Sequence, residues 1–157
     1  GIRVAAGPAG SANATSHPAM ILLDTNICIY IINAKPAAVL QRFRQYRIGE
    51  IGMCSVVAAE LAYGVAKSGS IRNRQALEMF LAPLTILPFD ETAVWAYGEL
   101  RAELERKGTK IGSLDTLIAA HALSQSALLV TNNTDEFTRV PGLQLDNWVT
   151  APSPGDS

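Results

Sequence analysis

The strongest constraint on the fold is a regular alternation of short apolar runs with segments of helical periodicity. The apolar runs have the length of buried strands, and the segments between them repeat apolar residues at intervals of three and four. The expected strands are 20–23, 51–54, 85–87 and 128–130, with a short last strand at 143–145. Strands that alternate with helices need crossover connections, which make the strands parallel and cover both faces of the sheet. We therefore predict a three-layer α/β/α domain with a mostly parallel central sheet.

Capping and turn residues set the expected bounds of the helices. Pro36 is placed to open one helix, Ser55 and Ser113 to cap two others, and Gly69 and Gly108 to end two. The expected helices are 26–32, one that begins at Pro36, one from Val56 to Gly69, 71–81, 91–107 and 114–124. Trp148 is expected to cover an end of the core.

Length and composition favour one domain in a reducing compartment. The 157 residues are 48% hydrophobic, enough for one buried core, and the net charge of -1 gives no overall basic excess that would indicate nucleic-acid binding. The only two cysteines, Cys28 and Cys54, lie in apolar segments, as buried free thiols do. We expect a leader without structure at 1–19, a domain at 20–150 and a flexible tail at 151–157. No signal peptide or membrane span is expected, so a cytoplasmic location is the prediction.

Three acids occupy positions where a carboxylate is either unusual or placed at the edge of the sheet where ligands bind. Asp24 follows the first predicted strand, and Thr131 and Asn133 follow the fourth, at the sheet edge where ligands collect in open α/β folds. Glu60 lies within an otherwise apolar helical segment, and a buried carboxylate there needs a partner, solvent or a cation. Asp115 stands in the first turn of a predicted helix, where a role toward the helix dipole alone would explain it.

Taken together, the three acids indicate a site for a hard cation. Carboxylates without cysteine ligands suit Mg²⁺ or Mn²⁺ better than zinc. His121 is the only histidine of the predicted domain and lies six residues beyond Asp115, so we expect it to be a packing or surface residue.

The motifs around these acids resemble the PIN-domain ribonucleases, and most closely the VapC-type toxins of toxin–antitoxin modules. The matching segments are Asp24-Thr25-Asn26, Ala59-Glu60-Leu61-Ala62-Tyr63-Gly64, Gly112 to Ala122, Leu100 to Gly108, and Val130 to Phe137 leading to Val140-Pro141-Gly142. The resemblance covers residues 20–148, and the order of the motifs makes it specific.

The resemblance implies a Mg²⁺-dependent endoribonuclease, with Mn²⁺ as a substitute, that inhibits translation by hydrolysing structured RNA such as tRNA. Asp24, Glu60 and Asp115 match the family's acidic triad, and products with a 5′-phosphate and a 3′-hydroxyl are implied. The position of a fourth acid matches Asn133, with Asp135 and Glu136 close behind, so the residue that completes the site is open. In supporting roles, Thr25 and Thr131 would orient the site by hydrogen bonds, while Asn26 would cap a helix.

The implied partners are an RNA substrate, a second copy of the chain in a homodimer, and a VapB-like antitoxin whose tail enters a groove. Three basic patches are candidates for RNA contact, although each is equally well explained as a solvated helix face. They are Arg42, Arg44 and Arg47; Arg101, Arg106, Lys107 and Lys110; and Arg72 and Arg74.

Two other readings remain open at this point. An aspartate after the first strand also occurs as the nucleophile of phosphatases that resemble the haloacid dehalogenase group, but Asn26 stands where that group has a second aspartate. The other alternative is a catalytically silent domain that keeps the fold and binds the antitoxin, and the presence of all three acids argues against it.

Overall fold

A five-stranded parallel sheet forms the centre of the fold in the computed structural model, which describes residues 20–150. The strands are β1 (Ile21–Leu23), β2 (Ile51–Cys54), β3 (Thr85–Leu87), β4 (Leu128–Val130) and β5 (Gln144–Asp146), in the spatial order β3-β2-β1-β4-β5. Every neighbouring pair of described strands is parallel. The predicted fold class is confirmed, with β5 one residue later than expected. The expected leader at 1–19 and tail at 151–157 lie outside the described residues.

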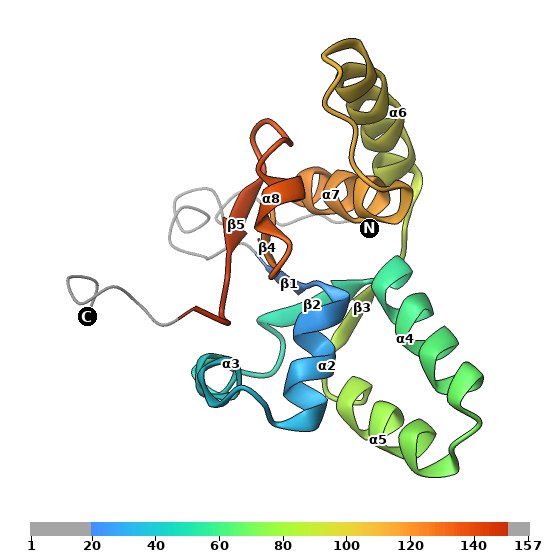
Figure 1. Cartoon of the computed structure of the whole chain (residues 1–157), viewed down its shortest axis with the longest axis vertical. Helices are drawn as coiled ribbons and strands as arrows, with labels where there is room; N and C mark the ends of the chain where they lie inside the picture. The colour runs from blue at the N-terminus through green and yellow to red at the C-terminus, as the bar shows by residue number, and fades with distance from the viewer. Residues whose placement is uncertain (1–19, 151–157) are drawn as a thin grey trace, which may run out of the picture.

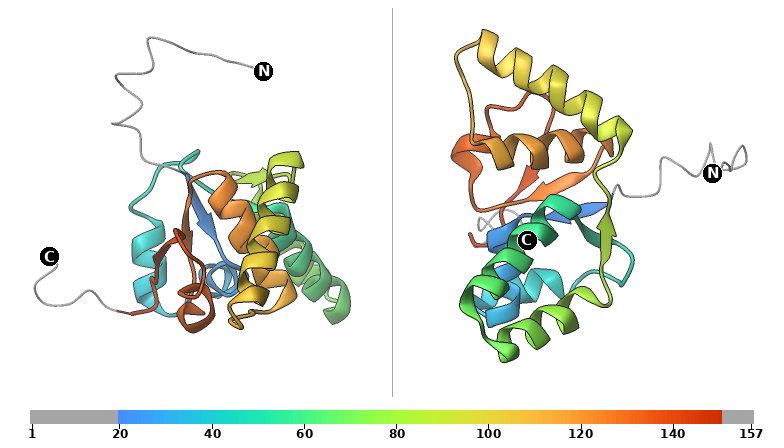
Figure 2. Two further views of the ribbon diagram at one scale, coloured as in Figure 1. Left: turned by 90° about the horizontal axis from the view of Figure 1, so that it is seen from above. Right: turned by 90° about the vertical axis from the view of Figure 1, so that its right-hand side faces the viewer.

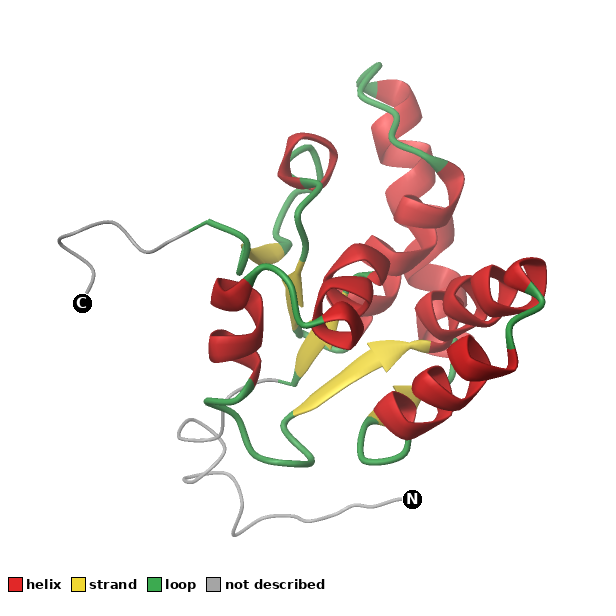
Figure 3. Cartoon of the chain, turned by 60° about the horizontal axis from the view of Figure 1, so that its bottom comes forward, coloured by secondary structure: helices red, strands yellow, loops and turns green. Residues whose placement is uncertain are grey.

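Helices cover both faces of this sheet (Figure 1). Their bounds are α2 (Thr25–Asn33), α3 (Ala37–Phe43), α4 (Ser55–Ser68), α5 (Ile71–Leu81), α6 (Glu91–Arg106), α7 (Ser113–Ser124) and α8 (Thr134–Phe137). Helices α6 and α7 pack together on one side, α2 and α5 lie on the other, and α4 contacts both α2 and α7 (Figure 2). The strands lie between these helices, and loops connect the strand ends to the helices (Figure 3).

The helix starts differ from those predicted because other groups cap them. Asp24, not Asn26, caps α2, and the thiol of Cys54, not Ser55, accepts from the backbone N–H of Val56 at the start of α4. The Ser55 hydroxyl instead accepts from the backbone N–H of Phe89, at 3.1 Å. Both helices therefore begin one residue earlier than predicted, at Thr25 and at Ser55.

The remaining differences are also at helix ends. Gly112 takes the N-cap position of α7 that Ser113 was expected to fill, Pro36 precedes α3 instead of beginning it, and α6 ends at Arg106. The one-turn helix α8 was not expected.

The core is apolar and continuous across the sheet. Trp148 is fully buried and stacks on Tyr46 with ring centroids 5.6 Å apart, so it closes one end of the core as predicted. Cys28 and Cys54 are free and buried, again as predicted. Within residues 20–150, no helix combines the length and the apolar character that a membrane span requires.

Gly52 in β2 allows β3 to lie close beside it. A Cβ on Gly52 would collide with the backbone oxygen of Thr85 and approach the Thr85 Cβ to 3.2 Å and the Met20 sulfur to 3.3 Å. The colliding atom is backbone and cannot rotate away. A side chain at this position therefore displaces β3 and disturbs its pairing with β2, the strand that leads into α4.

We expect Gly52→Ala to lower the free energy of unfolding by about 1 to 3 kcal/mol, the usual cost of overpacking a core. Urea unfolding measures the change. Gly98→Ala in α6 is the matched control, because no atom lies within 4 Å of its added Cβ and alanine is the better helix former. Equal stability of the two variants would contradict the close approach of β2 and β3.

Candidate active site

The site begins at the neighbouring carboxyl ends of β1 and β4, where the strand order reverses. Leu23 of β1 is paired with Val130 of β4, so Asp24 and Thr131 leave the sheet side by side. The Asp24 backbone N–H donates to the Val130 carbonyl at 2.9 Å, which extends the ladder by one step. The predicted position of these residues at a switch point of the sheet is confirmed.

Asp24 is held by a hydrogen bond to each carboxylate oxygen. Its Oδ1 accepts from the backbone N–H of Thr25 at 2.8 Å, and its Oδ2 accepts from the Thr131 hydroxyl at 2.7 Å. The side chain is 6% exposed. Burial raises the pKa of Asp24, the two hydrogen bonds oppose that rise, and the charge of Glu60 adds to it. Asp24 is thus fixed in orientation while its ionised form is only partly compensated.

Glu60 reaches the same place from α4. The Thr25 hydroxyl donates to Glu60 Oε1 at 2.7 Å, so Thr25 contacts Asp24 through its backbone and Glu60 through its side chain. The partner that a carboxylate in this apolar helix requires is therefore a hydroxyl on α2. Thr25 and Thr131 both make the orienting contacts expected of them.

Asp115 joins a cluster with Asn133 and Glu136. The Asn133 side-chain N–H₂ group donates to Asp115 Oδ2 at 3.0 Å and to Glu136 Oε2 at 2.8 Å. Glu136 Oε1 accepts from the backbone N–H of Gly112, at 3.2 Å. Asn133 therefore bridges two acids, and Glu136 on α8 supplies the fourth carboxylate. Asp135 is exposed, and only its backbone carbonyl takes part in a side-chain hydrogen bond, with Thr138.

The ionisation of Asp115 is strongly disfavoured in this arrangement. Burial, a hydrogen bond with Glu136 and the nearby charges of Asp24, Glu136 and Glu60 raise the pKa of Asp115 to about 7. The hydrogen bond from the Asp115 carboxyl lowers the pKa of Glu136. At neutral pH the two carboxyls thus share a proton, as paired acids do. A cation in the site would take the place of that proton.

The four predicted catalytic residues, Asp24, Glu60, Asp115 and Asn133, line one open cavity of about 370 Å³. Its walls include Asp24, Thr25, Asn26, Glu60, Asp115, Asn132 and Asn133. Asn26 is an exposed wall residue and not the helix cap that was expected. Asn132 also lines the cavity, directly before Asn133. Glu136 contacts the cavity-lining Asn133 through a hydrogen bond. The sequence did not decide whether Glu136 takes part in the site, because its position depends on α8 and on the backbone N–H of Gly112.

The donor set has the chemistry of a Mg²⁺ or Mn²⁺ site. Within residues 20–150, no three acidic, histidine or cysteine side chains already surround one point as a complete ligand set. Glu60 and Asp24 instead each accept a hydrogen bond from a threonine hydroxyl, of Thr25 and Thr131 respectively. Mg²⁺ commonly keeps several waters and uses only one or two carboxylates, so an oxygen-lined cavity of this kind fits it without full convergence.

The candidate RNA-binding arginines near α3 do not reach this cavity. The Arg42 guanidinium pairs with Asp146 at 2.7 Å and lies 5.9 Å from the centre of the Trp148 ring, and its RNA contact stays a prediction. Arg44 and Arg47 are exposed at and after the end of α3. Arg101 and Lys110 line a different cavity, beside α7.

His121 is a packing residue, one of the two roles expected for it. It is fully buried, its Nδ1 lies 2.7 Å from the Cys54 sulfur, and its ring meets Phe89 edge-on. Burial lowers the pKa of His121. The contact joins the start of α4 to α7, the two helices that carry Glu60 and Asp115, and leaves the histidine outside the acidic cavity.

The fold and the four gathered acids define a PIN domain, and the model of the PIN-domain family matches residues 21–143. The chain belongs to this family. Its relatives include "Ribonuclease VapC2" of Rickettsia felis, 46% identical over 129 residues that cover 81% of this chain and 96% of the relative. They also include "tRNA(fMet)-specific endonuclease VapC" of Shigella flexneri, 44% identical over 128 residues with the same coverage of 81% and 96%.

Solved structures give the same result. VapBC2 of Rickettsia felis, bound to a promoter DNA fragment, matches with a TM-score of 0.77 and 45% identity over 82% of this chain and 98% of that one. VapBC-1 of Haemophilus influenzae matches with a TM-score of 0.73 and 32% identity, over 83% of this chain and 99% of that one. The predicted membership among VapC-type PIN domains is confirmed.

We expect the metal-free protein to lose stability as the pH rises from 5 to 8. The folded chain holds a proton on Asp115 up to about pH 7, whereas the ordinary carboxyl pKa is near 3.8. Between these values the folded state binds more protons than the unfolded state, so stability falls with rising pH. Thermal unfolding with chelator measures the trend.

The matched variant is Asp115→Asn, which removes the titrating group and should flatten the pH dependence. Millimolar Mn²⁺ should raise the melting temperature more at pH 8 than at pH 6, because the cation binds the ionised site. An identical pH profile in wild type and variant would contradict the role given to Asp115.

Proposed function

We propose that this VapC-type PIN-domain ribonuclease hydrolyses phosphodiester bonds in structured RNA with Mg²⁺, or Mn²⁺ in its place, and acts as the toxin of a toxin–antitoxin pair that inhibits translation. The observation that carries the proposal is the gathering of Asp24, Glu60 and Asp115 around one cavity at the switch point of the sheet. Glu136 adds a fourth carboxylate through Asn133. The nuclease relatives support RNA as the substrate.

Asp24 and Asp115 are the proposed cation ligands, with Glu60 binding directly or through water. Bound there, a divalent cation would lower the pKa of a water and compensate charge on the phosphate oxygens. Thr131 and Thr25 keep the carboxylates of Asp24 and Glu60 in fixed orientations. Residues that orient ligands in this way commonly contribute 10- to 100-fold to metal affinity or activity.

The Asp115–Glu136 pair is proposed to bind and release a proton at the part of the acidic cavity that Asp115 and Asn133 line. In the metal-free site it holds a proton on Asp115, and Asn133 keeps the two carboxyls in contact. When the proton leaves, the ionised Asp115 faces the cavity. Glu136 remains bound to the backbone N–H of Gly112, so it acts as a positioning residue for Asp115.

We expect purified protein to cut bulk tRNA with Mg²⁺ or Mn²⁺ and to stop when chelator is added. Asp24→Asn and Asp115→Asn should fold yet lose more than about 100-fold in rate, because each removes a ligand and not merely its support. Thr131→Val and Glu136→Gln should lose about 10- to 100-fold. Gel assays of cleavage, with mapping of the 5′-phosphate ends, measure the effects.

The alternative functions give different results in the same assays. A catalytically silent domain leaves RNA intact at all cation concentrations. A phosphatase hydrolyses small phosphomonoesters through an acyl-phosphate on Asp24, which trapping and mass spectrometry detect. Undiminished cleavage by both Asp→Asn variants would place the active site elsewhere.

An antitoxin partner is supported by an apolar groove next to the acids. A cavity of about 270 Å³ opens between α2, α4 and α5, and Ile29, Ile32, Val65 and Leu77 line it together with Glu60. The related solved structures are described as VapBC complexes. We propose that a VapB-like tail occupies this groove. Exposed apolar side chains on α6, Trp95 at 69% and Val94 at 51%, support the proposed homodimer.

Co-expression with the neighbouring open reading frame is expected to give a tight complex without ribonuclease activity. Ile29→Glu should weaken the complex, because it puts a charge at an exposed apolar position of the groove wall, while Ile71→Glu, at an exposed apolar residue outside the groove-lining set, should not. Light scattering gives the stoichiometry and shows whether two copies are present. Recovery of free, active enzyme would contradict the partner proposal.

A further inference from the structure

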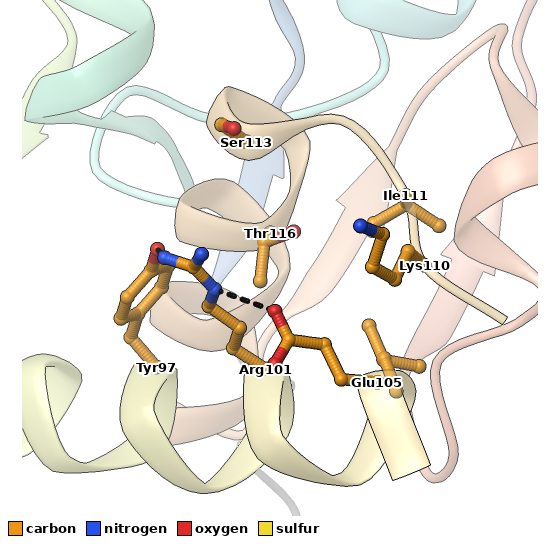
Figure 4. Close-up of a pocket in the computed structure, with 8 residues that line it drawn as sticks. Tyr97, Arg101, Glu105, Lys110, Ile111, Ser113 and Thr116 are labelled. Carbon is orange, nitrogen blue, oxygen red and sulfur yellow. Dashed lines mark hydrogen bonds and ion pairs between the residues drawn. The ribbon is translucent and has the colours of Figure 1, made fainter. Parts of the chain in front are cut away.

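A second cavity, separate from the acidic one, lies between α6 and the segment that leads into α7 (Figure 4). Its volume is about 90 Å³. Tyr97, Arg101 and Glu105 of α6 form one wall, while Lys110 and Ser113 come from the other side. The small volume and the polar walls suit a phosphate group better than a base.

Arg101 is held in a fixed orientation at this cavity. Its Nε donates to Glu105 at 3.0 Å, and one terminal nitrogen donates to the Tyr97 hydroxyl at 3.0 Å (Figure 4). A guanidinium carries five N–H donors, so three are left for a ligand. Because the group is already oriented, less conformational entropy is lost when it binds an oxyanion.

Lys110 supplies a second positive charge without a counter-ion. Among residues 20–150, no carboxylate lies within 4.0 Å of its ammonium group. Figure 4 shows the ammonium directed toward Thr116 and the space in front of α7. With Glu105 as the only acid in the wall, the lining has two cations and one anion. The cavity therefore keeps an excess positive charge.

The other paired cations lie outside this cavity. Arg42 is paired with Asp146 and lies over the Trp148 ring. Arg74 and Lys107 pair with acids one turn away along their own helices, as Arg101 does with Glu105. Arg101 and Lys110 are set apart because both line one cavity beside α7, the helix that carries Asp115.

We propose that the Arg101–Lys110 cavity binds a backbone phosphate of the RNA at a point outside the acidic cavity. The inference rests on the proposed ribonuclease function. Every nucleotide carries a phosphate, and cations near an acidic site offset its repulsion of the RNA backbone. Ser113 and Thr116 place the cavity on one face of the first turns of α7, and Asp115 lies on a different face of the same helix. A phosphate in the cavity thus positions the RNA and reads no base.

The test is binding of labelled bulk tRNA between 50 and 200 mM salt, measured in an Asp24→Asn background that does not cut. Arg101→Gln and Lys110→Gln should each weaken binding several-fold and reduce the slope of log affinity against log salt by about 1. Lys35→Gln and Lys67→Gln are the matched controls, because both lysines are exposed, lie outside the lining of this cavity and of the acidic one, and belong to none of the three basic patches; they should change neither quantity.

Two further measurements separate positioning from damage. With Asp24 intact, the cavity variants should raise KM for tRNA with kcat nearly unchanged, and their Mn²⁺ affinity should equal that of the wild type. Lys110→Arg should keep the salt slope. A loss that appears equally in Lys67→Gln, or a change in Mn²⁺ affinity, would overturn the proposal.

The outcome also distinguishes this inference from the proposed function. Cleavage of tRNA that does not depend on Arg101 or Lys110 would overturn the cavity proposal and leave the ribonuclease standing. Binding that depends on both residues, without cleavage by the wild type, would overturn the ribonuclease and leave the cavity. A loss of antitoxin binding in the cavity variants with unchanged tRNA binding would assign the cavity to a protein partner and overturn the phosphate proposal.

Discussion

The cost of placing several carboxylates together in one partly buried place is the constraint on which this site depends. Burial raises the pKa of Asp24 and of Asp115, and the charge of Glu60 adds to both rises, with the charges of Asp24 and Glu136 contributing further at Asp115. Like charges in a partly desolvated place remain together only where the fold holds them and where other groups compensate. The sheet meets the first condition, because β1 and β4 are adjacent and Asp24 follows β1 at the carboxyl ends of the two strands.

Neutral donors supply the second condition. Two threonine hydroxyls, an asparagine amide and the backbone N–H of Gly112 all donate to the acids, and none of these donors carries a positive charge. A lysine or arginine in their place would satisfy the carboxylates and leave little for a cation to do. The carboxylates are therefore hydrogen-bonded well enough for the site to form, while their negative charge is left for a cation to neutralise.

The parts that sequence predicts well are those set by local pattern. The strands were recognised by their apolar runs, and Asp24 by its place at the end of one. The cap at Ser55 was missed because a distant residue engages it: its hydroxyl accepts from Phe89, 34 residues away. The ion pair of Arg42 with Asp146, 104 residues away, could not be predicted from local pattern for the same reason.

The order in which the chain is made has a consequence for when it can act. Thr131 donates to Asp24 across 107 residues, and Asn133 and Glu136 come later still. Since β4 pairs with β1, a nascent chain that ends before β4 has β1 with an open edge and lacks Glu136, the fourth acid. Such long-range pairing forms late during synthesis. The acidic cavity is therefore assembled only after the segment through α8 has left the ribosome, so most of this domain is made before its site can exist.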